Sequence, residues 1–140
     1  MSEPITFRFD VDGENFSSAG EASVKVKKQL RQLGISPDVI RRVSIAMYEG
    51  EINMVIHAHG GEADVVVYEN KIEIILNDTG PGIPNIELAM KEGYSTAPDN
   101  IRSLGFGAGM GLPNMKRYTD DMKIETELGK GTCITMVVNF

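Results

Sequence analysis

Apolar and polar residues alternate in several short segments of the chain, which is the pattern of β-strands that bury one face. Near the N-terminus Ile5, Phe7 and Phe9 alternate with polar residues and predict a first strand. Two later runs rich in β-branched residues are separated by only a short turn, which indicates an antiparallel hairpin. Two more strands flank a glycine-rich turn near the C-terminus. The predicted strands cover residues 4–11, 63–68, 72–76, 122–127 and 132–138.

Other segments carry apolar residues three or four positions apart, the spacing of an amphipathic helix. The first of them stops at Gly34, a typical residue at a helix C-terminus. The second starts at Ser36, Pro37 and Asp38, a capping residue followed by two residues that favour the first turn. Gly50 lies inside this helix, where glycine costs ~1 kcal/mol relative to alanine, so we expect a close neighbour that needs the space. The predicted helices cover residues 17–33, 37–59 and 112–118.

These elements predict a single α+β domain over residues 1–140. Antiparallel strands combined with three helices favour a two-layer α/β sandwich, with a mostly antiparallel sheet on one side and the helices on the other. A chain of 140 residues is long enough to bury one core of this kind.

Charge and composition narrow the function classes. The formal net charge of -6 argues against nucleic acid and anionic lipid as partners, because lysine and arginine surfaces bind them. No apolar run approaches the roughly 18 to 20 residues of a membrane span, and the N-terminus lacks the pattern of a secretion signal. Cys133 is the only cysteine, so no intramolecular disulfide can form. We therefore expect a cytoplasmic protein that binds neither nucleic acid nor membrane.

The long second helix carries the first group of candidate site residues. Glu49 and Asn53 are four positions apart, so both side chains project from the same face. An asparagine oxygen can ligate Mg²⁺ and a glutamate one turn away can accept a proton, which suits a site for a magnesium nucleotide. A solvated polar patch is the alternative interpretation of this pair. Glu51 lies off this face, and we expect it to be solvated.

A second group follows the hairpin, in the segment 77–84. Asp78 stands at the end of a buried strand, and Gly80 and Gly82 come soon after it. Glycines at this spacing let the backbone bend tightly and let a flat ligand approach closely. Asp78 could then accept a hydrogen bond from an exocyclic amino group. An ordinary turn rich in aspartate and glycine is the alternative.

A third group is a glycine-rich stretch that leads into the short third helix. Its alternating glycines leave successive N–H groups free to point at phosphate oxygens. The stretch lacks the spacing of the dinucleotide-binding fingerprint, and the sequence contains no P-loop. The glycines of this stretch are Gly105, Gly107, Gly109 and Gly111.

Taken in order along the chain, these features resemble the Bergerat ATP-binding fold shared by gyrase, the chaperone Hsp90, histidine kinases and MutL. The resemblance rests on an E-x-x-x-N helix, a D-x-G-x-G turn, a glycine-rich lid and a terminal G-x-G-T strand, and it covers residues 39–138. Within that superfamily the chain is similar to the bacterial anti-sigma factor serine/threonine-protein kinases. Their N box and first glycine box look like residues 46–57 and 78–83, and residues 93–98 look like the start of their lid.

The resemblance implies roles for the residues that would act on the phosphates of ATP. Glu49 would be the catalytic base that activates a serine of a partner protein. Asn53 would ligate the Mg²⁺ that bridges the phosphates. The lid would close over the phosphates, and Arg102 is a candidate for the cation that contacts the γ-phosphate. The lid glycines are Gly105, Gly107, Gly109 and Gly111.

The resemblance likewise implies how adenine would be bound. Asp78 would contact the adenine amino group, and Gly80 and Gly82 would lie beside the ring. Thr132, in the terminal strand, would support adenine through its hydroxyl group or through a water molecule.

The function implied by the resemblance is an ATP- and Mg²⁺-dependent protein serine kinase that acts as an anti-sigma regulatory factor. Its protein partners would be a sigma factor, an anti-anti-sigma-like substrate, or both, and the resemblance favours a homodimer. The alternative is a catalytically silent, ATP-gated partner-binding module. Gly50, Glu51 and the lack of a clear lid cation favour the module, whereas Glu49 favours the kinase.

Overall fold

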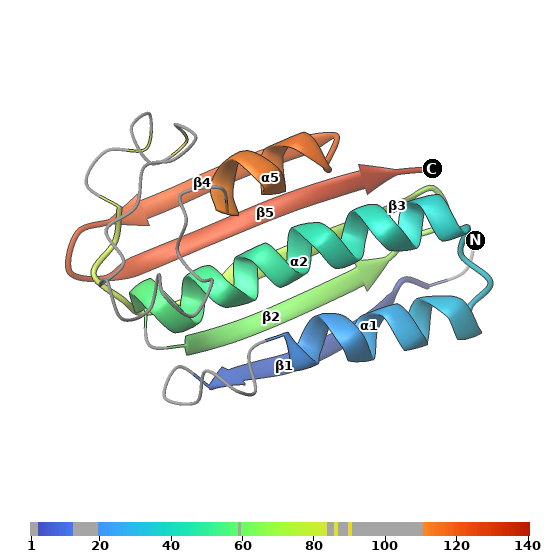
Figure 1. Ribbon diagram of the computed structural model, residues 1–140, viewed down its shortest axis with the longest axis horizontal. Helices are drawn as coiled ribbons and strands as arrows, with labels where there is room; N and C mark the ends of the chain where they lie inside the picture. Colours follow the sequence, from blue (N-terminus) through green and yellow to red (C-terminus); the bar gives the residue numbers. More distant parts are fainter. Residues whose placement is uncertain (1–2, 13–19, 59, 84–85, 87–89, 91–110) are drawn as a thin grey trace, which may run out of the picture.

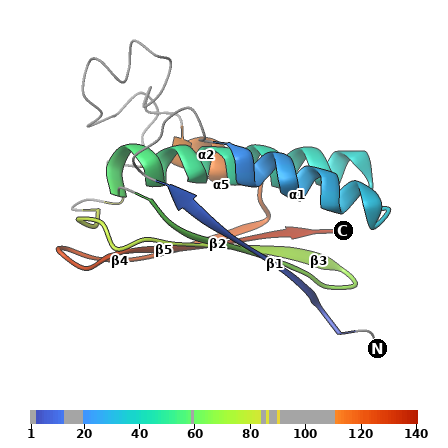
Figure 2. The same ribbon diagram turned by 90° about the horizontal axis from the view of Figure 1, so that it is seen from below.

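The computed structural model describes residues 3–12, 20–58, 60–83, 86, 90 and 111–140. Within this part of the chain the protein has two layers, a sheet and a set of helices that cover one of its faces (Figure 2). The α+β sandwich predicted from the sequence is confirmed. None of the described helices is both long enough and apolar enough to cross a membrane.

The strands are β1 Ile5–Asp12, β2 Gly60–Val67, β3 Lys71–Asn77, β4 Asp121–Glu127 and β5 Gly131–Asn139. They form one sheet in the order β1-β2-β3-β5-β4, and every pair of neighbours is antiparallel. β2 and β3 form the predicted hairpin, in which the Tyr68 N–H donates to the Lys71 carbonyl at 2.8 Å. Because β3 pairs with β5, Asn77 at the end of β3 lies opposite Cys133 near the start of β5.

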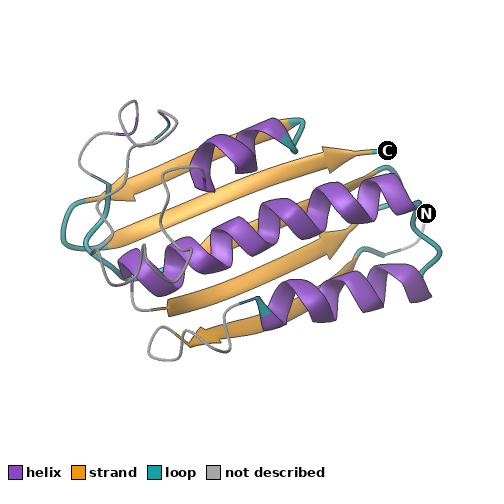
Figure 3. Ribbon diagram, viewed as in Figure 1, coloured by secondary structure: helices purple, strands orange, loops and turns teal. Residues whose placement is uncertain are grey.

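The described helices are α1 Glu21–Gln32, α2 Pro37–Ala58 and α5 Gly111–Arg117. They lie on the same face of the sheet, with α2 between the other two (Figures 1 and 3). α1 stops as predicted, since Gly34 follows it with a left-handed φ of 77°. Its start differs from the prediction, because Gly20 is the N-cap residue, with a φ of 96°. The other predicted residues, 17–19, lie outside the described residues.

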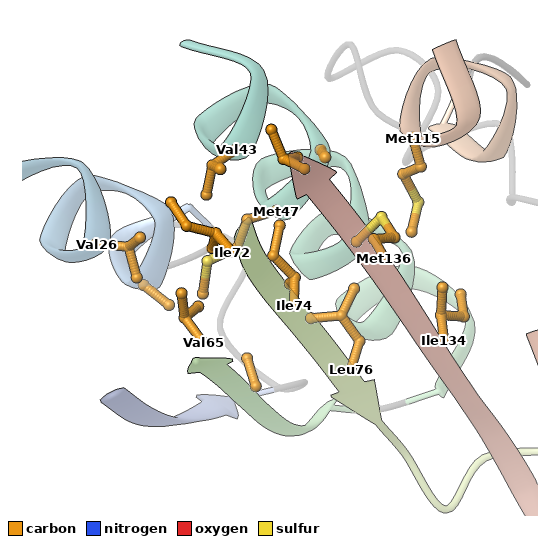
Figure 4. Close-up of a cluster of buried hydrophobic side chains, with 14 of the residues drawn as sticks. Val26, Val43, Met47, Val65, Ile72, Ile74, Leu76, Met115, Ile134 and Met136 are labelled. Atoms are coloured by element: carbon orange, nitrogen blue, oxygen red, sulfur yellow. The ribbon is translucent and has the colours of Figure 1, made fainter. Parts of the chain in front are cut away.

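The core lies between the helices and the inner face of the sheet (Figure 4). β3 buries every second residue, as its alternating sequence predicts, and α2 buries the apolar stripe predicted from its helical spacing. Full burial of a large apolar side chain contributes about 1.5–3 kcal/mol to stability. The labelled core residues are Val26, Val43, Met47, Val65, Ile72, Ile74, Leu76, Met115, Ile134 and Met136.

Gly50 lies where α2 approaches both the sheet and α5. A Cβ added at this position would collide with Leu76 Cδ1 of β3 and would come within 3.5 Å of Met115 Cε of α5. The prediction that a close neighbour needs the space is therefore confirmed. Because Gly50 has no side chain, the turn of α2 that carries Glu49 and Asn53 can pack directly on the sheet.

Candidate functional site

The described candidate residues lie at the end of the molecule where β3 ends and β5 begins, on the left in Figure 1. Asp78 follows β3 directly, and Thr132 is the second residue of β5. Glu49 and Asn53 come from the C-terminal half of α2, the helix that packs on these strands. The sheet therefore supplies one group of polar side chains and the helix layer supplies another.

The Asp78 carboxylate is oriented by the backbone on both sides of it. Its Oδ1 accepts from the Gly80 N–H at 2.9 Å and from the Thr132 N–H at 3.1 Å. The Asp78 N–H in turn donates to the Thr132 carbonyl at 2.9 Å. Both of the hydrogen bonds that the carboxylate accepts within the described part of the chain use Oδ1, so Oδ2 is the oxygen that could accept from a ligand.

The turn that carries Gly80 and Gly82 is packed against the β4–β5 hairpin. Gly82 has a φ of 83°, and a Cβ there would come within 2.7 Å of the Glu127 carbonyl oxygen. The Ile83 N–H donates to Thr126 Oγ1 at 2.8 Å. Glycine is therefore required at position 82 by the backbone conformation and by this close approach.

Thr126 is a further candidate residue that was not predicted from the sequence. Its Oγ1 lies 2.9 Å from Thr132 Oγ1, so the hydroxyl of Thr132 is held from the neighbouring strand. Thr132 itself is buried, with 6% of its surface exposed. The register of the hairpin was the available signal, because a turn at residues 129–131 places Thr126 directly opposite Thr132.

Glu49 and Asn53 both face α5. Asn114 Nδ2 of α5 donates to Glu49 Oε1 at 3.5 Å, and Asn53 Nδ2 lies 4.0 Å from Met115 Sδ. A Cβ added to Gly111, the first residue of α5, would come within 3.1 Å of Asn53 Oδ1. The predicted shared face is confirmed, and Gly111 is brought directly to it. Asn114 was missed, since nothing in the sequence sets the position of α5 relative to α2.

The prediction that Glu51 is solvated is wrong. Only 2% of its surface is exposed, and its carboxylate accepts hydrogen bonds from the backbone N–H groups of Gly20, Ala22 and Ser23. Burial raises the pKa of Glu51 above its ordinary value, and the hydrogen bonds from these backbone groups partly offset that effect. Glu51 is two positions from Glu49, so it points to the other side of α2.

Part of the predicted lid lies outside the described residues. This applies to Gly105, Gly107, Gly109 and Arg102, whereas Gly111 is described. Within the described part of the chain no group of three or more histidine, cysteine, aspartate or glutamate side chains could hold a metal ion.

The site combines a helix that carries a glutamate and an asparagine on one face with an aspartate–glycine turn after the adjacent strand. An antiparallel sheet lies behind both. This combination is typical of a Bergerat-type ATPase domain. Residues 38–140 match the model of the family described as histidine kinase-, DNA gyrase B- and HSP90-like ATPases. The chain belongs to this family. The resemblance stated from the sequence is thereby confirmed.

Curated relatives cover almost the whole chain. The anti-sigma F factor of Clostridium acetobutylicum is 32% identical over 100% of this chain and 96% of its own length. The anti-sigma F factor of Priestia megaterium is 28% identical over 96% of this chain and 90% of its own length. Within the ATPase family, the chain therefore groups with anti-sigma factors.

A solved structure has the same fold. The crystal structure of the RsbU and RsbW domains of a Mycobacterium tuberculosis protein matches 96% of this chain with a TM-score of 0.63 and 14% sequence identity. This chain spans 32% of that longer chain. At this level of identity the likeness concerns the fold alone.

Proposed function

We propose that this protein is an ATP- and Mg²⁺-dependent protein serine kinase that acts as an anti-sigma regulatory factor. The observation that carries the proposal is that Glu49 and Asn53 face the start of α5 together, at the end of the molecule where Asp78 and Thr132 lie. The relatives named anti-sigma F factors support a sigma factor as one partner. The substrate would be a serine of an anti-anti-sigma-like protein.

ATP would bind with its adenine against Asp78. Because Asp78 Oδ1 already accepts two backbone hydrogen bonds, Oδ2 would accept from the adenine amino group. An ionised carboxylate can only accept, and guanine carries a carbonyl at that ring position, so the site would prefer adenine. The Thr132 hydroxyl, held by Thr126, would support the ring directly or through water.

The residues around Asn53 fit Mg²⁺. Asn53 Oδ1 is a neutral oxygen, and Gly111 beside it has no side chain to fill the space. Mg²⁺ is usually held by one or two protein oxygens together with substrate phosphates and water. When bound, Mg²⁺ would neutralise negative charge on the phosphates. Asn53 would be its protein ligand, and the nucleotide would supply further oxygens.

Glu49 would act on the hydroxyl of the incoming serine. Its carboxylate would take the serine proton as the serine oxygen bonds to the γ-phosphorus and the bond to the ADP oxygen breaks. Asn114 would keep the carboxylate oriented, because its Nδ2 donates to Glu49 Oε1. A positioned general base contributes about 10² to 10⁴ in rate.

Replacement of Glu49 tests the kinase directly. Purified protein would be incubated with labelled ATP, Mg²⁺ and candidate partner proteins, and transfer to serine would be measured. Glu49→Ala should lower the transfer rate by about 10² to 10⁴ while ATP affinity stays within a few-fold of native. Glu73→Ala is the matched control, since Glu73 alternates with the buried residues of β3 and lies on the opposite face of the sheet.

The rival function is an ATP-gated binding module that transfers no phosphate. It would be supported if the native protein binds both ATP and partner but shows no transfer with any metal or partner. Gly50 and Glu51 no longer favour this rival, because packing against Leu76 and hydrogen bonding to α1 account for both residues.

The remaining expectations belong to the same proposal. The chain would act as one ATP-binding domain over residues 1–140, in the cytoplasm, and as a homodimer. Sedimentation equilibrium over a range of concentrations would give the oligomeric state. A strictly monomeric protein at micromolar concentration would contradict the homodimer while leaving the kinase proposal intact.

A further inference from the structure

Glu51 connects the helix that carries the candidate site to the start of α1. Its Oε2 accepts from the Gly20 N–H at 3.0 Å and from the Ala22 N–H at 3.2 Å, and its Oε1 accepts from the Ser23 N–H at 2.6 Å. The ring of Tyr48 adds a second contact, because a Cβ on Gly20 would come within 2.8 Å of Tyr48 Cε1. The start of α1 therefore contacts Tyr48 and Glu51, which lie on either side of Glu49 in the sequence.

α1 depends on this contact because it lacks a capping side chain of its own. The first N–H groups of a helix have no partner within the helix and need an acceptor from elsewhere. The N-cap residue of α1 is Gly20, which makes no side-chain capping bond. Glu51, 28 to 31 residues away in sequence, supplies the acceptor in its place.

The dependence is mutual, since Glu51 is a carboxylate in a buried position. A buried charge without hydrogen-bond partners strongly destabilises a fold, so Glu51 has to stay with these N–H groups. With both oxygens engaged, Glu51 is not placed to take a proton from a substrate. Any effect it has on the site must act through other residues.

The direction of that effect follows from helix geometry. Two positions along a helix correspond to a rotation of about 200°, so Glu51 projects from the side of α2 opposite Glu49 and Asn53. Glu49 and Asn53 contact α5 on one side, while Glu51 contacts α1 on the other. The turn 49–53 is thus held from both sides.

We propose that Glu51 is a positioning residue that fixes the rotation of the 49–53 turn of α2 and so directs Glu49 and Asn53 toward α5. The proposal rests on the proposed kinase function for its kinetic consequence. Its structural consequence, the placement of Asn53 against Met115, is independent of that function.

Two variants separate positioning from stability. Glu51→Gln keeps the size of the side chain but leaves one acceptor oxygen and brings an amide donor against the N–H groups of α1. Glu51→Met keeps a similar volume but removes the charge and both acceptor oxygens, so it breaks all three hydrogen bonds to the start of α1. Glu21→Gln is the control, because it removes an exposed carboxylate from the same first turn of α1.

The first measurement needs no nucleotide. Nuclear Overhauser effects between the Asn53 side-chain amide and the Met115 methyl group should weaken in both Glu51 variants and persist in Glu21→Gln. Amide exchange at Ala22 and Ser23 should become about 10-fold faster in the Glu51 variants, as expected for loss of a hydrogen bond.

The second measurement is kinetic. In both Glu51 variants the rate constant for phosphate transfer should fall by about 10-fold to 10²-fold, because small misplacements of a reacting group have effects of this size. Affinity for metal-free ATP, which depends on Asp78, should stay within about 3-fold of native. A purely structural role would instead leave the rate constant of the folded fraction unchanged.

Each outcome decides the proposal. Weaker nuclear Overhauser effects between Asn53 and Met115 in both Glu51 variants support the positioning role. If the native protein then transfers no phosphate, only the kinase proposal fails. Unchanged effects, or transfer rates equal to those of Glu21→Gln, overturn it. If Glu51→Gln does not fold, Glu51→Met decides, and failure of both to fold assigns Glu51 to stability alone.

Discussion

The two oxygens of the Asp78 carboxylate have different surroundings, so its structural role and its proposed role in binding can be tested separately. Oδ1 holds the Gly80 turn and the start of β5 together, and Oδ2 is the oxygen proposed to contact adenine. Asp78→Asn can keep the first acceptor but presents an amide donor where adenine also has a donor. We expect it to fold and to bind ATP about 10-fold to 100-fold more weakly, the effect of an unpaired polar group.

Calorimetry with ATP and GTP measures this preference. Asp78→Ala should lose most ATP binding and also loosen the turn, because it removes both acceptors. Tight binding of GTP by the native protein would contradict the assignment of Asp78 to adenine.

Asn53 should act through the metal. Its Oδ1 lies beside Gly111, and a neutral oxygen of this kind suits the mixed shell of Mg²⁺. Asn53→Ala should weaken Mg-ATP by at least about 10-fold, the effect of losing a residue that supports a metal. Metal-free ATP should be affected far less. Titrations in EDTA and in MgCl₂ compare the two, and equal losses would assign Asn53 a structural role only.

Cys133 gives a pH-dependent test of the sheet next to Asp78. Burial raises the pKa of the Cys133 thiol above its ordinary 9.0, and the charges of Glu125 and Asp78 raise it further. A raised pKa means a smaller thiolate fraction at a given pH, so alkylation should be slower in the folded protein than in the unfolded chain. Iodoacetamide rates between pH 7 and pH 10 measure this difference.

A second variant, Glu125→Gln, tests the electrostatic cause, because it removes the Glu125 charge and leaves that of Asp78. It should lower the thiol pKa and speed alkylation at pH 8.5 without changing the rate of the unfolded chain. A native thiol that titrates at or below its ordinary value would be inconsistent with this account of the site.

Single residues also mark where sequence reasoning stops. Glu51 lies four positions after Met47 and three before Met54, which is the spacing of the buried stripe of α2. The helical periodicity therefore indicated that Glu51 is buried. The wrong prediction came from the general expectation that a charged side chain is solvated. Asn114 is different, because its contact with Glu49 depends on how two helices far apart in sequence are packed.

At the scale of elements, α2 shows how packing overrides intrinsic preference. Alanine at position 50 would favour the helix by ~1 kcal/mol, but its Cβ would collide with Leu76. Overpacking of a core typically costs 1–3 kcal/mol, which exceeds this gain, so Gly50→Ala should lower the free energy of unfolding by up to about 2 kcal/mol. Urea unfolding followed by circular dichroism measures the change.

Leu76→Val supplies the compensating change for Gly50→Ala. It shortens the side chain that the new Cβ would meet, so the double variant should be more stable than the sum of the single effects predicts. Strict additivity of the two substitutions would mean that Leu76 is not the obstacle.

Strands and helices were predictable to different degrees for a physical reason. All five strands follow from local patterns of alternation, β-branched residues or flanking turns, and the short turns indicate hairpins, so the pairings of β2 with β3 and of β4 with β5 could be anticipated. The pairing of β3 with β5 is a long-range contact that no local pattern encodes. The start of α1 at Glu21 likewise depends on a cap supplied by α2.

At the scale of the whole molecule, the candidate site and the Arg42–Asp120 contact between the helix layer and the sheet lie at opposite ends of the sheet. Asp78 and Thr132 lie where β3 ends and β5 begins, whereas Asp120 lies where β4 begins and β5 ends, at the opposite end of the sheet. There Arg42 of α2 donates to Asp120 Oδ2 at 3.0 Å, and the Asn139 N–H donates to the same oxygen at 2.7 Å. Asp120 thus joins the helix layer to the end of the sheet away from the candidate site.

Asp120→Ala should therefore reduce stability and leave nucleotide binding unchanged. An exposed ion pair alone contributes about 0–1 kcal/mol. Here the Arg42 side chain is only 21% exposed and would lose its acceptor, so we expect a loss of about 1–2 kcal/mol in the free energy of unfolding. The control is Asp121→Ala, at the neighbouring exposed position that begins the edge strand β4, which should change stability by less than about 0.5 kcal/mol. Chemical unfolding measures the loss of stability, and ATP calorimetry on the same samples measures nucleotide binding. Weaker ATP binding by folded Asp120→Ala would contradict the prediction and would show that the two ends of the molecule are coupled.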